Sequence, residues 1–316
     1  MTTPSPRFAE LLRSRVLFVS GKGGTGKSVC ALALARLAAA QGRRVLLVEM
    51  DAQRPALTSL VGRAPTYAPA AIGGGVHVAN LTWDQALDDW LKHVVSVPRL
   101  VRTILKNRVV TLFLEATPGA RDLVVMTRVH QLAGEFDTVV VDMPASGNAV
   151  AMFSVAHTAQ RLFVTGPVRR CADELLGLYG RPDTCTVLVA LPEEMVVNET
   201  LETAAKIAGE CAPLRLGAVL LNRAAPWGFS DQERAVLQGL AARPGLSAEA
   251  QGIVDAGAWA LDRAASTQDA AARLSEGLGD IPVLALPALP NATRGGAVAE
   301  QLGAALRSAA RLGGAA

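Results

Sequence analysis

Residues Gly21–Ser28 read G-K-G-G-T-G-K-S, and this stretch decides the fold together with the segments on either side of it. It matches the pattern G-x-x-x-x-G-K-[ST] of a phosphate-binding loop. The loop follows a short apolar run, Arg15–Ser20 (R-V-L-F-V-S), and precedes a helix-favouring segment rich in alanine and leucine that stops at Gly42. Because the first run is typical of a fully buried strand, the loop has the strand-before, helix-after setting that the pattern requires.

The chemistry expected of this loop follows from its residue types. Glycines let the backbone curl so that successive N–H groups point inward at phosphate oxygens, and the helix start adds unpaired N–H donors. Lys27 is expected to bridge the β- and γ-phosphates, and the Ser28 hydroxyl to bind Mg²⁺. The loop residues expected to contact the nucleotide are Gly21, Lys22, Gly23, Gly24, Thr25, Gly26, Lys27, Ser28 and Val29.

Apolar runs alternate with helix-like segments along most of the chain, which is typical of parallel sheets covered on both faces. Further strands are predicted at Arg44–Glu49, Thr138–Val141, Arg161–Thr165, Thr186–Ala190, Arg215–Leu221 and Ile281–Leu286, and helices at about Glu199–Cys211 and Gly296–Leu312. We expect an α/β fold with a doubly wound, mainly parallel sheet of seven or eight strands. It would form a single P-loop domain over residues 15–316, after an N-terminal segment 1–14.

The stretch from about residue 82 to 130 has a different pattern, because its apolar residues recur every three or four positions. It predicts a small helical subdomain inserted into the sheet domain. Two interpretations stay open. The helices either cover the sheet, or they help to form a partner-binding face through Trp90, Leu100, Leu105 and Phe113.

Composition excludes several classes of protein. Half of the residues are hydrophobic and 19% are charged, with a net charge of +3, so disorder is not expected and charge alone implies no nucleic-acid partner. The four cysteines are widely spaced and the histidines scattered, so no zinc site is expected. No signal peptide or apolar stretch of membrane-spanning length is evident. We expect a cytoplasmic protein whose membrane contact is at most peripheral, at the inner face.

The second lysine of the loop, Lys22, makes G-K-G-G-T-G-K-S similar to the deviant P-loop of MinD/ArsA-class ATPases. Other segments extend this resemblance: E-M-D-A-Q-R-P from Glu49, V-V-V-D-M-P-A-S-G-N from Val139, L-P-E-E-M-V-V-N-E-T from Leu191 and L-P-A-L-P-N-A-T-R-G-G from Leu286. Their order resembles the ArsA-type ATPases, which include the arsenite-pump subunit and the tail-anchored-protein-targeting ATPase. The match is especially close to bacterial ArsA-like proteins of unassigned role.

This resemblance implies a role for several further residues. Asp51 would position the attacking water and lie near the metal, and Asp142 would hold Mg²⁺ through a water ligand. Lys22 would reach across a dimer interface to the partner's nucleotide, so Lys22, Lys27 and Asp51 are the expected catalytic residues. Asn222 would read the adenine base, with backbone at Pro287 and Leu289 completing its pocket. Ser28, Asp51 and Asp142 form the expected magnesium set, and ATP and ADP the expected nucleotides.

The chain also departs from the family pattern. The first-switch pattern D-P-A-H is Asp51-Ala52-Gln53-Arg54 here, and Asn148 replaces the second-switch histidine. Because an amide cannot protonate as imidazole does, hydrolysis is expected to be slow. The arsenite-binding cysteines and the CxxC zinc clasp have no counterparts, which argues against metalloid pumping and tail-anchored-protein delivery.

The resulting expectation is a Mg-ATP-hydrolysing, ArsA-like switch that acts on an unknown protein client. It would work as a homodimer or as a heterodimer with an ArsA-like paralogue. Two alternatives stay open: a MinD/ParA-like positioning ATPase on a membrane or nucleoid, and a weakly hydrolysing regulatory subunit of a heterodimer.

Overall fold

The computed structural model describes residues 10–50, 56–94, 119–225, 228–289 and 296–312. Its centre is an eight-stranded sheet in the order β3-β4-β2-β5-β1-β6-β7-β8. The strands are β1 Val16–Ser20, β2 Val45–Met50, β3 Ala70–Gly73, β4 Val76–Leu81, β5 Thr138–Asp142, β6 Thr184–Ala190, β7 Leu216–Ala224 and β8 Val283–Pro287. All neighbouring strands run parallel except β3, which pairs with β4 in the antiparallel sense. The predicted doubly wound, mainly parallel sheet is confirmed.

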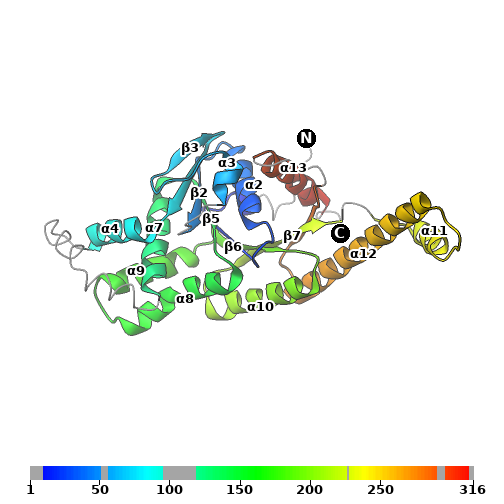
Figure 1. Cartoon of the computed structure of the whole chain (residues 1–316). Coiled ribbons are helices and arrows are strands. Elements are labelled where there is room, and N and C mark those ends of the chain that lie inside the picture. The colour runs from blue at the N-terminus through cyan, green and yellow to red at the C-terminus, as the bar shows by residue number, and fades with distance from the viewer. Residues whose placement is uncertain (1–9, 51–55, 95–118, 226–227, 290–295, 313–316) are drawn as a thin grey trace.

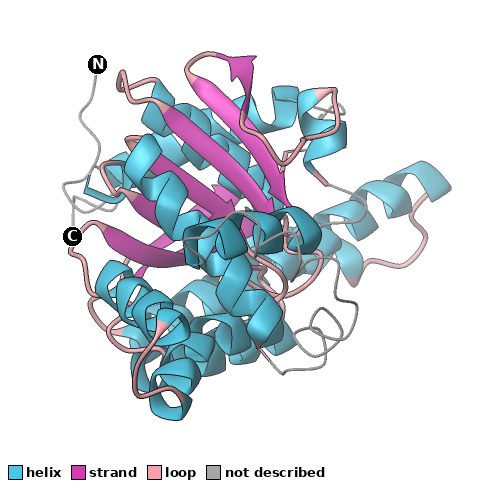
Figure 2. Cartoon of the chain, turned by 90° about the vertical axis from the view of Figure 1, so that its left-hand side faces the viewer, coloured by secondary structure: helices cyan, strands magenta, loops and turns pink. Residues whose placement is uncertain are grey.

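Helices cover both faces of this sheet (Figures 1 and 2). They are α2 Lys27–Ala39, α3 Leu57–Val61, α4 Trp83–Val94, α7 Ala120–Glu135, α8 Ser146–Leu162, α9 Pro167–Tyr179, α10 Glu194–Glu210, α11 Asp231–Ala241, α12 Ala248–Leu278 and α13 Gly296–Leu312. Helices α2 and α13 pack on one face, while α7, α8, α9 and α10 pack on the other. Side chains that alternate along each strand therefore enter different cores.

The central strands are apolar on both sides because neither side meets water. Every residue of β1, β5 and β6 is buried. On the α8 face, Phe18, Phe153 and Tyr179 form an edge-to-face aromatic cluster with ring centroids 5.1 to 6.1 Å apart. Such burial is the main driving force for the sheet, at about 25 cal/mol per Å² of apolar surface.

Helix α4 belongs to the core and does not present Trp90 to a partner. Its residues Trp83, Leu87, Trp90 and Leu91 recur at helical spacing and are buried against α7. The indole Nε1 of Trp90 donates to Cys171 Sγ at 3.3 Å. The covering interpretation therefore holds for Trp90, and the partner-face interpretation is wrong for it. Leu100, Leu105 and Phe113 lie outside the described residues, and the predicted division into segment, domain and inserted subdomain stays a prediction.

One predicted strand is wrong. Arg161–Thr165 forms no strand, because α8 continues to Leu162 and the chain then turns toward α9. Leu162 and Val164 are 70% and 82% exposed, so this apolar run is not part of the sheet.

Several elements of the structure were not predicted from the sequence. Strands β3 and β4 form a hairpin at the sheet edge, and helices α8, α9, α11 and α12 were likewise not foreseen. Helix α11 and the first part of α12 pack against each other and project from the body of the molecule, whereas the end of α12 packs against α10 and the sheet (Figure 1). At Gly257 the two helices approach closely, and a Cβ there would lie 2.7 Å from Leu237 Cδ2, so the Leu237 side chain would have to shift.

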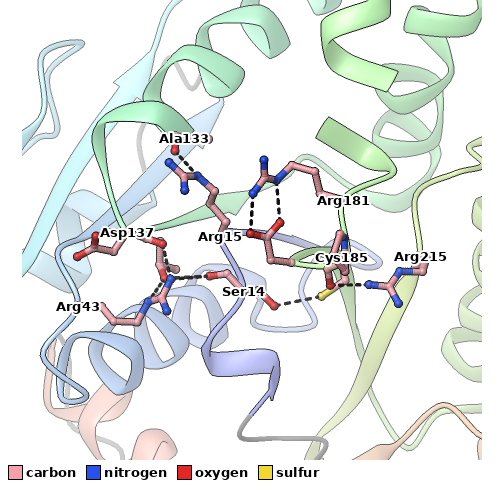
Figure 3. Close-up of polar contacts among 11 residues, drawn as sticks. Ser14, Arg15, Arg43, Ala133, Asp137, Arg181, Cys185 and Arg215 are labelled. Carbon is pink, nitrogen blue, oxygen red and sulfur yellow. Dashed lines mark hydrogen bonds and ion pairs between the residues drawn. The ribbon is translucent and has the colours of Figure 1, made fainter. Parts of the chain in front are cut away.

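The edge of the sheet where the parallel strands begin is held together by arginines (Figure 3). Arg15 Nε donates to the Ala133 carbonyl at 2.7 Å, and Arg43 donates to the Asp137 carbonyl. These side chains tie α7 and the loop after it to the starts of β1 and β2. The carboxyl ends of the parallel strands lie at the opposite side of the sheet, and the loops that follow them are available to bind a ligand. None of the helices in the described ranges is long and apolar enough to cross a membrane.

Candidate functional site

The phosphate-binding loop lies where the direction of winding of the sheet changes. Strand β1 is flanked by β5 on one side and by β6 on the other. The connections that follow β1 and its neighbours therefore run in different directions and leave a crevice between them. In open α/β sheets, ligands bind in the crevice at such a point. Lys22 lies in the loop after β1, Ser146 is the first residue of α8, which follows β5, and Glu199 lies in α10, which follows β6. The structure brings the three side chains together.

Two glycines of the loop are required by its geometry. Gly21 has φ +145°, and a Cβ there would lie 2.2 Å from the Val189 carbonyl oxygen. Gly26 has φ +92°, and a Cβ there would lie 2.6 Å from Asn222 Nδ2. Any side chain at either position would displace the loop from β6 and β7. The two glycines thus allow the loop to approach the Val189 carbonyl and the Asn222 side chain closely.

Lys27 opens α2 and lies over the loop. Its Nζ donates to the Lys22 carbonyl at 3.2 Å, an oxygen that also accepts from Thr25 Oγ1 at 2.8 Å. Burial lowers the pKa of the Lys27 ammonium, while the carboxylates of Asp142 and Glu199 oppose that effect. A partly desolvated ammonium beside a helix N-terminus that lacks a side-chain cap is suited to hold an anion.

Asp142 ends β5 next to the loop, and it is buried. Burial raises the pKa of its carboxyl from 3.8 to about 6, against a hydrogen bond from Ser28 and the charge of Lys27. Within the described ranges, its Oδ1 has no hydrogen-bond partner. A buried carboxylate oxygen without a partner is costly unless a cation or water fills the place.

The residues present therefore fit a magnesium-bound nucleotide. The Ser28 hydroxyl and the Asp142 carboxylate are the hard oxygen donors that Mg²⁺ takes, with the remaining positions left to phosphate and water. Mg²⁺ would neutralise phosphate charge there. Among the described residues, no group of three or more histidine, cysteine or acidic side chains forms a metal cage. The four cysteines are buried and free.

Lys22 makes a contact that sequence reasoning missed. Its Nζ lies 3.4 Å from Glu199 Oε2, and Ser146 Oγ donates to Glu199 Oε1. Helix α10 begins at Glu194, five residues before the predicted start, so Glu199 lies in its second turn and faces the loop. The only signal available was the segment L-P-E-E-M-V-V-N-E-T, to which no role was attached.

Glu49 is a second residue that sequence reasoning missed. It lies at the end of β2 in register with Asp142 of β5, and it is 6% exposed. Its Oε1 accepts from the Ala56 N–H at 2.6 Å, which anchors the residue that precedes α3. Burial raises the pKa of its carboxyl, although the hydrogen bonds from the Ala56 and Leu57 amides oppose this. An acidic residue inside an otherwise apolar strand was the available signal.

The residues predicted around the base do lie together. Asn222, Pro287 and Leu289 line a cavity of about 270 Å³ beside the loop, and Gly26 and Val29 form its near wall. The Asn222 amide is 8% exposed, and its Nδ2 donates to the Thr25 carbonyl at 2.8 Å. This contact ties the end of β7 to the phosphate-binding loop and leaves the amide oxygen as an acceptor.

Asp51, the predicted residue for water positioning, lies outside the described residues. Of the predicted set, the structure places Lys22, Lys27, Ser28 and Asp142 around one loop and groups the proposed base-binding residues next to it. Gly23 and Gly24 are exposed and lie at the open side of the loop.

A glycine-rich loop between a buried strand and a helix, at the winding switch of a parallel sheet, defines a P-loop nucleotide-binding fold. The chain belongs to the CobQ/CobB/MinD/ParA nucleotide-binding domain family, which matches residues 16–306. It is 30% identical over 235 residues to the protein named ATPase BagA of Mycobacterium tuberculosis, covering 70% of this chain and 68% of that one. It is 27% identical over 199 residues to the septum site-determining protein MinD of Synechocystis sp., covering 59% of this chain and 68% of MinD. The ArsA-type resemblance is narrower than this family and stays a prediction.

Proposed function

We propose that this chain binds Mg-ATP at the loop Gly21–Ser28, hydrolyses it slowly, and works as a nucleotide-driven dimeric switch on a protein client. The observation that carries the proposal is the meeting of Lys27, Ser28 and Asp142 at one point. There a buried carboxylate oxygen is left without a partner among the described residues. A magnesium ion with its phosphate and water ligands would remove that unfavourable state.

The naming of a relative as an ATPase supports the hydrolysis part of the proposal. In the proposed reaction, Lys27 and the loop amides hold the β- and γ-phosphates, and Ser28 with Asp142 holds Mg²⁺. Asp51 would orient the attacking water. ATP must bind the closed dimer more tightly than the open chain, because a ligand without differential affinity shifts no equilibrium.

Calorimetry with Mg-ATP and Mg-ADP, followed by a steady-state phosphate-release assay, tests this function. We expect saturable binding of both nucleotides and slow phosphate release that needs Mg²⁺. Asp51→Asn should bind ATP but release phosphate far more slowly. Absence of any binding heat with either nucleotide would overturn the proposal.

A MinD/ParA-like positioning ATPase is the second candidate, favoured by the similarity to the MinD protein. Such a protein needs a surface helix free to meet a membrane. In α13, however, Ala299, Leu302 and Leu306 are buried, and the helix packs against α2. Co-sedimentation with anionic liposomes, with and without Mg-ATP, separates the candidates, since only the positioning ATPase should pellet in an ATP-dependent manner.

The third candidate function is that of a regulatory subunit that hydrolyses ATP weakly within a heterodimer. It is suggested by Asn148, which stands where the resemblance calls for histidine. In that case, phosphate release by the isolated chain would be close to background and would rise when an ArsA-like paralogue is added. Nucleotide binding would be retained.

A further inference from the structure

Glu199 on α10 contacts both the loop after β1 and the start of α8. Its carboxylate accepts the Ser146 hydroxyl on Oε1 and pairs with the Lys22 ammonium on Oε2, at 3.4 Å. Its charge also acts on Lys27. One side chain on α10 thus touches the phosphate-binding loop and the first residue of α8 at once.

We propose that Glu199 is a positioning residue that holds Lys22 within its own subunit until nucleotide and a second copy of the chain draw it away. This inference rests on the proposed function, in which Lys22 serves the partner's nucleotide. A lysine paired with a carboxylate of its own chain has to leave that carboxylate before it can contact phosphate elsewhere. Glu199 therefore sets part of the free-energy difference between the open chain and the closed dimer.

The ion pair between Lys22 and Glu199 is weak enough to be broken when nucleotide binds. The side chains of Lys22 and Glu199 are each 35% exposed, so water screens their attraction. Ion pairs of this kind contribute little, and the triphosphate of a nucleotide carries several negative charges against the single charge of Glu199. The pair can hold Lys22 in the free chain without preventing its transfer.

Ser146 gives the contact a link to the nucleotide. It follows Asp142 by four residues, and its backbone N–H donates to the Gly21 carbonyl at 3.2 Å. Ser146 therefore connects the loop, through Gly21, with the carboxylate that pairs with Lys22.

Among the described residues, the ion pair of Lys22 is with Glu199. Glu202 lies one turn further along α10 and pairs with Lys206 at 2.7 Å. Both line the same cavity of about 450 Å³ as Ser146 and Glu199. Glu202→Gln is therefore a matched control, since it removes a carboxylate from the same helix and cavity but not the partner of Lys22.

A double-mutant cycle tests the inference. Glu199→Gln keeps an oxygen that accepts from Ser146 but removes the charge that holds Lys22. We expect sedimentation velocity with Mg²⁺ and the analogue AMP-PNP to give a dimer Kd lower by about two- to five-fold, the range for a partly exposed ion pair. In a Lys22→Ala background, Glu199→Gln should leave the Kd unchanged. Glu199→Asp, which keeps the charge, should stay closer to the parent, and so should Glu202→Gln.

The outcomes separate this inference from the function on which it rests. If the parent chain binds no AMP-PNP by calorimetry, the proposed function fails and the role of Glu199 fails with it. If the parent binds and dimerises, but Glu199→Gln has no effect or acts equally with and without Lys22, only the role of Glu199 is overturned. A merely structural Glu199 would change the melting temperature without this dependence on Lys22.

Discussion

Lys27 is the residue of the loop best placed to bind phosphate, because its ammonium is partly desolvated and lies near the Lys22 carbonyl and Asp142. Lys27→Ala should therefore remove the stabilisation of the folded chain by Mg-ATP. At a nucleotide concentration one hundred times the Kd, that stabilisation is about 2.7 kcal/mol. Thermal unfolding with and without Mg-ATP measures it. Lys92→Ala is the control, since Lys92 pairs with Asp88 on α4, away from the loop. A full rise in melting temperature in Lys27→Ala would show that the loop is assigned wrongly.

Asp142 makes stability depend on pH in the nucleotide-free chain. The pKa of its carboxyl is raised in the folded state to about 6, so its contribution is most favourable below about pH 4. That contribution is lost as the pH rises through 6, because the charged carboxylate is then buried. The free energy of unfolding lost in this way is at most about 3 kcal/mol, because a pKa change of one unit corresponds to about 1.36 kcal/mol.

Asp142→Asn should remove this dependence. The melting temperature of the variant relative to the parent should increase from pH 4.5 to pH 7.5, measured without magnesium or nucleotide. The same variant should bind Mg-ATP more weakly. If the difference in melting temperature between the variant and the parent is the same at both pH values, Asp142 is not a buried carboxylate with a raised pKa.

At the scale of the element, α4 and α12 each carry a tryptophan, but only the tryptophan of α4 is buried. Trp90 on α4 is 8% exposed and contacts Cys171, whereas Trp259 on α12 is 58% exposed and lies beside Arg263. Trp90→Ala should lower the free energy of unfolding by about 3 to 5 kcal/mol. Trp259→Ala should change it by no more than about 0.5 kcal/mol. Urea denaturation of the two variants compares them directly, and similar losses would contradict the described packing of α4.

At the scale of the whole molecule, the proposed switch requires nucleotide to change the association of the chain. Sedimentation velocity should show a larger species with Mg²⁺ and AMP-PNP than with Mg-ADP. Lys22→Ala should reduce steady-state phosphate release while affecting nucleotide binding less, because its proposed target is the partner's nucleotide. Normal phosphate release in Lys22→Ala would exclude the role of Lys22 between subunits.

The phosphate-binding loop, the strand before it, the helix after it and the parallel character of the sheet could all be predicted from sequence. Local rules sufficed for these features. Continuous apolar runs indicate strands buried on both faces, and glycine is required wherever backbone approaches as closely as Gly21 approaches Val189. The edge hairpin of β3 and β4 and the projecting pair α11 and α12 were missed. No residue of β3 or α11 is fully buried, so burial imposes little pattern on them. Strand β4 is largely buried, but His77 and Asn80 interrupt its apolar run.

The tertiary structure alone decided which side chains meet. Lys22 and Glu199 are far apart in the chain, and no periodicity relates them, yet the order of β5, β1 and β6 places the loop after β1 beside α10. The same holds for the Asn222 amide on the Thr25 carbonyl and for Trp90 against Cys171. Sequence by itself determined the nucleotide-binding class, because that class depends on a contiguous loop. The contacts that would tune the loop depend on strand order, which is a property of the folded sheet.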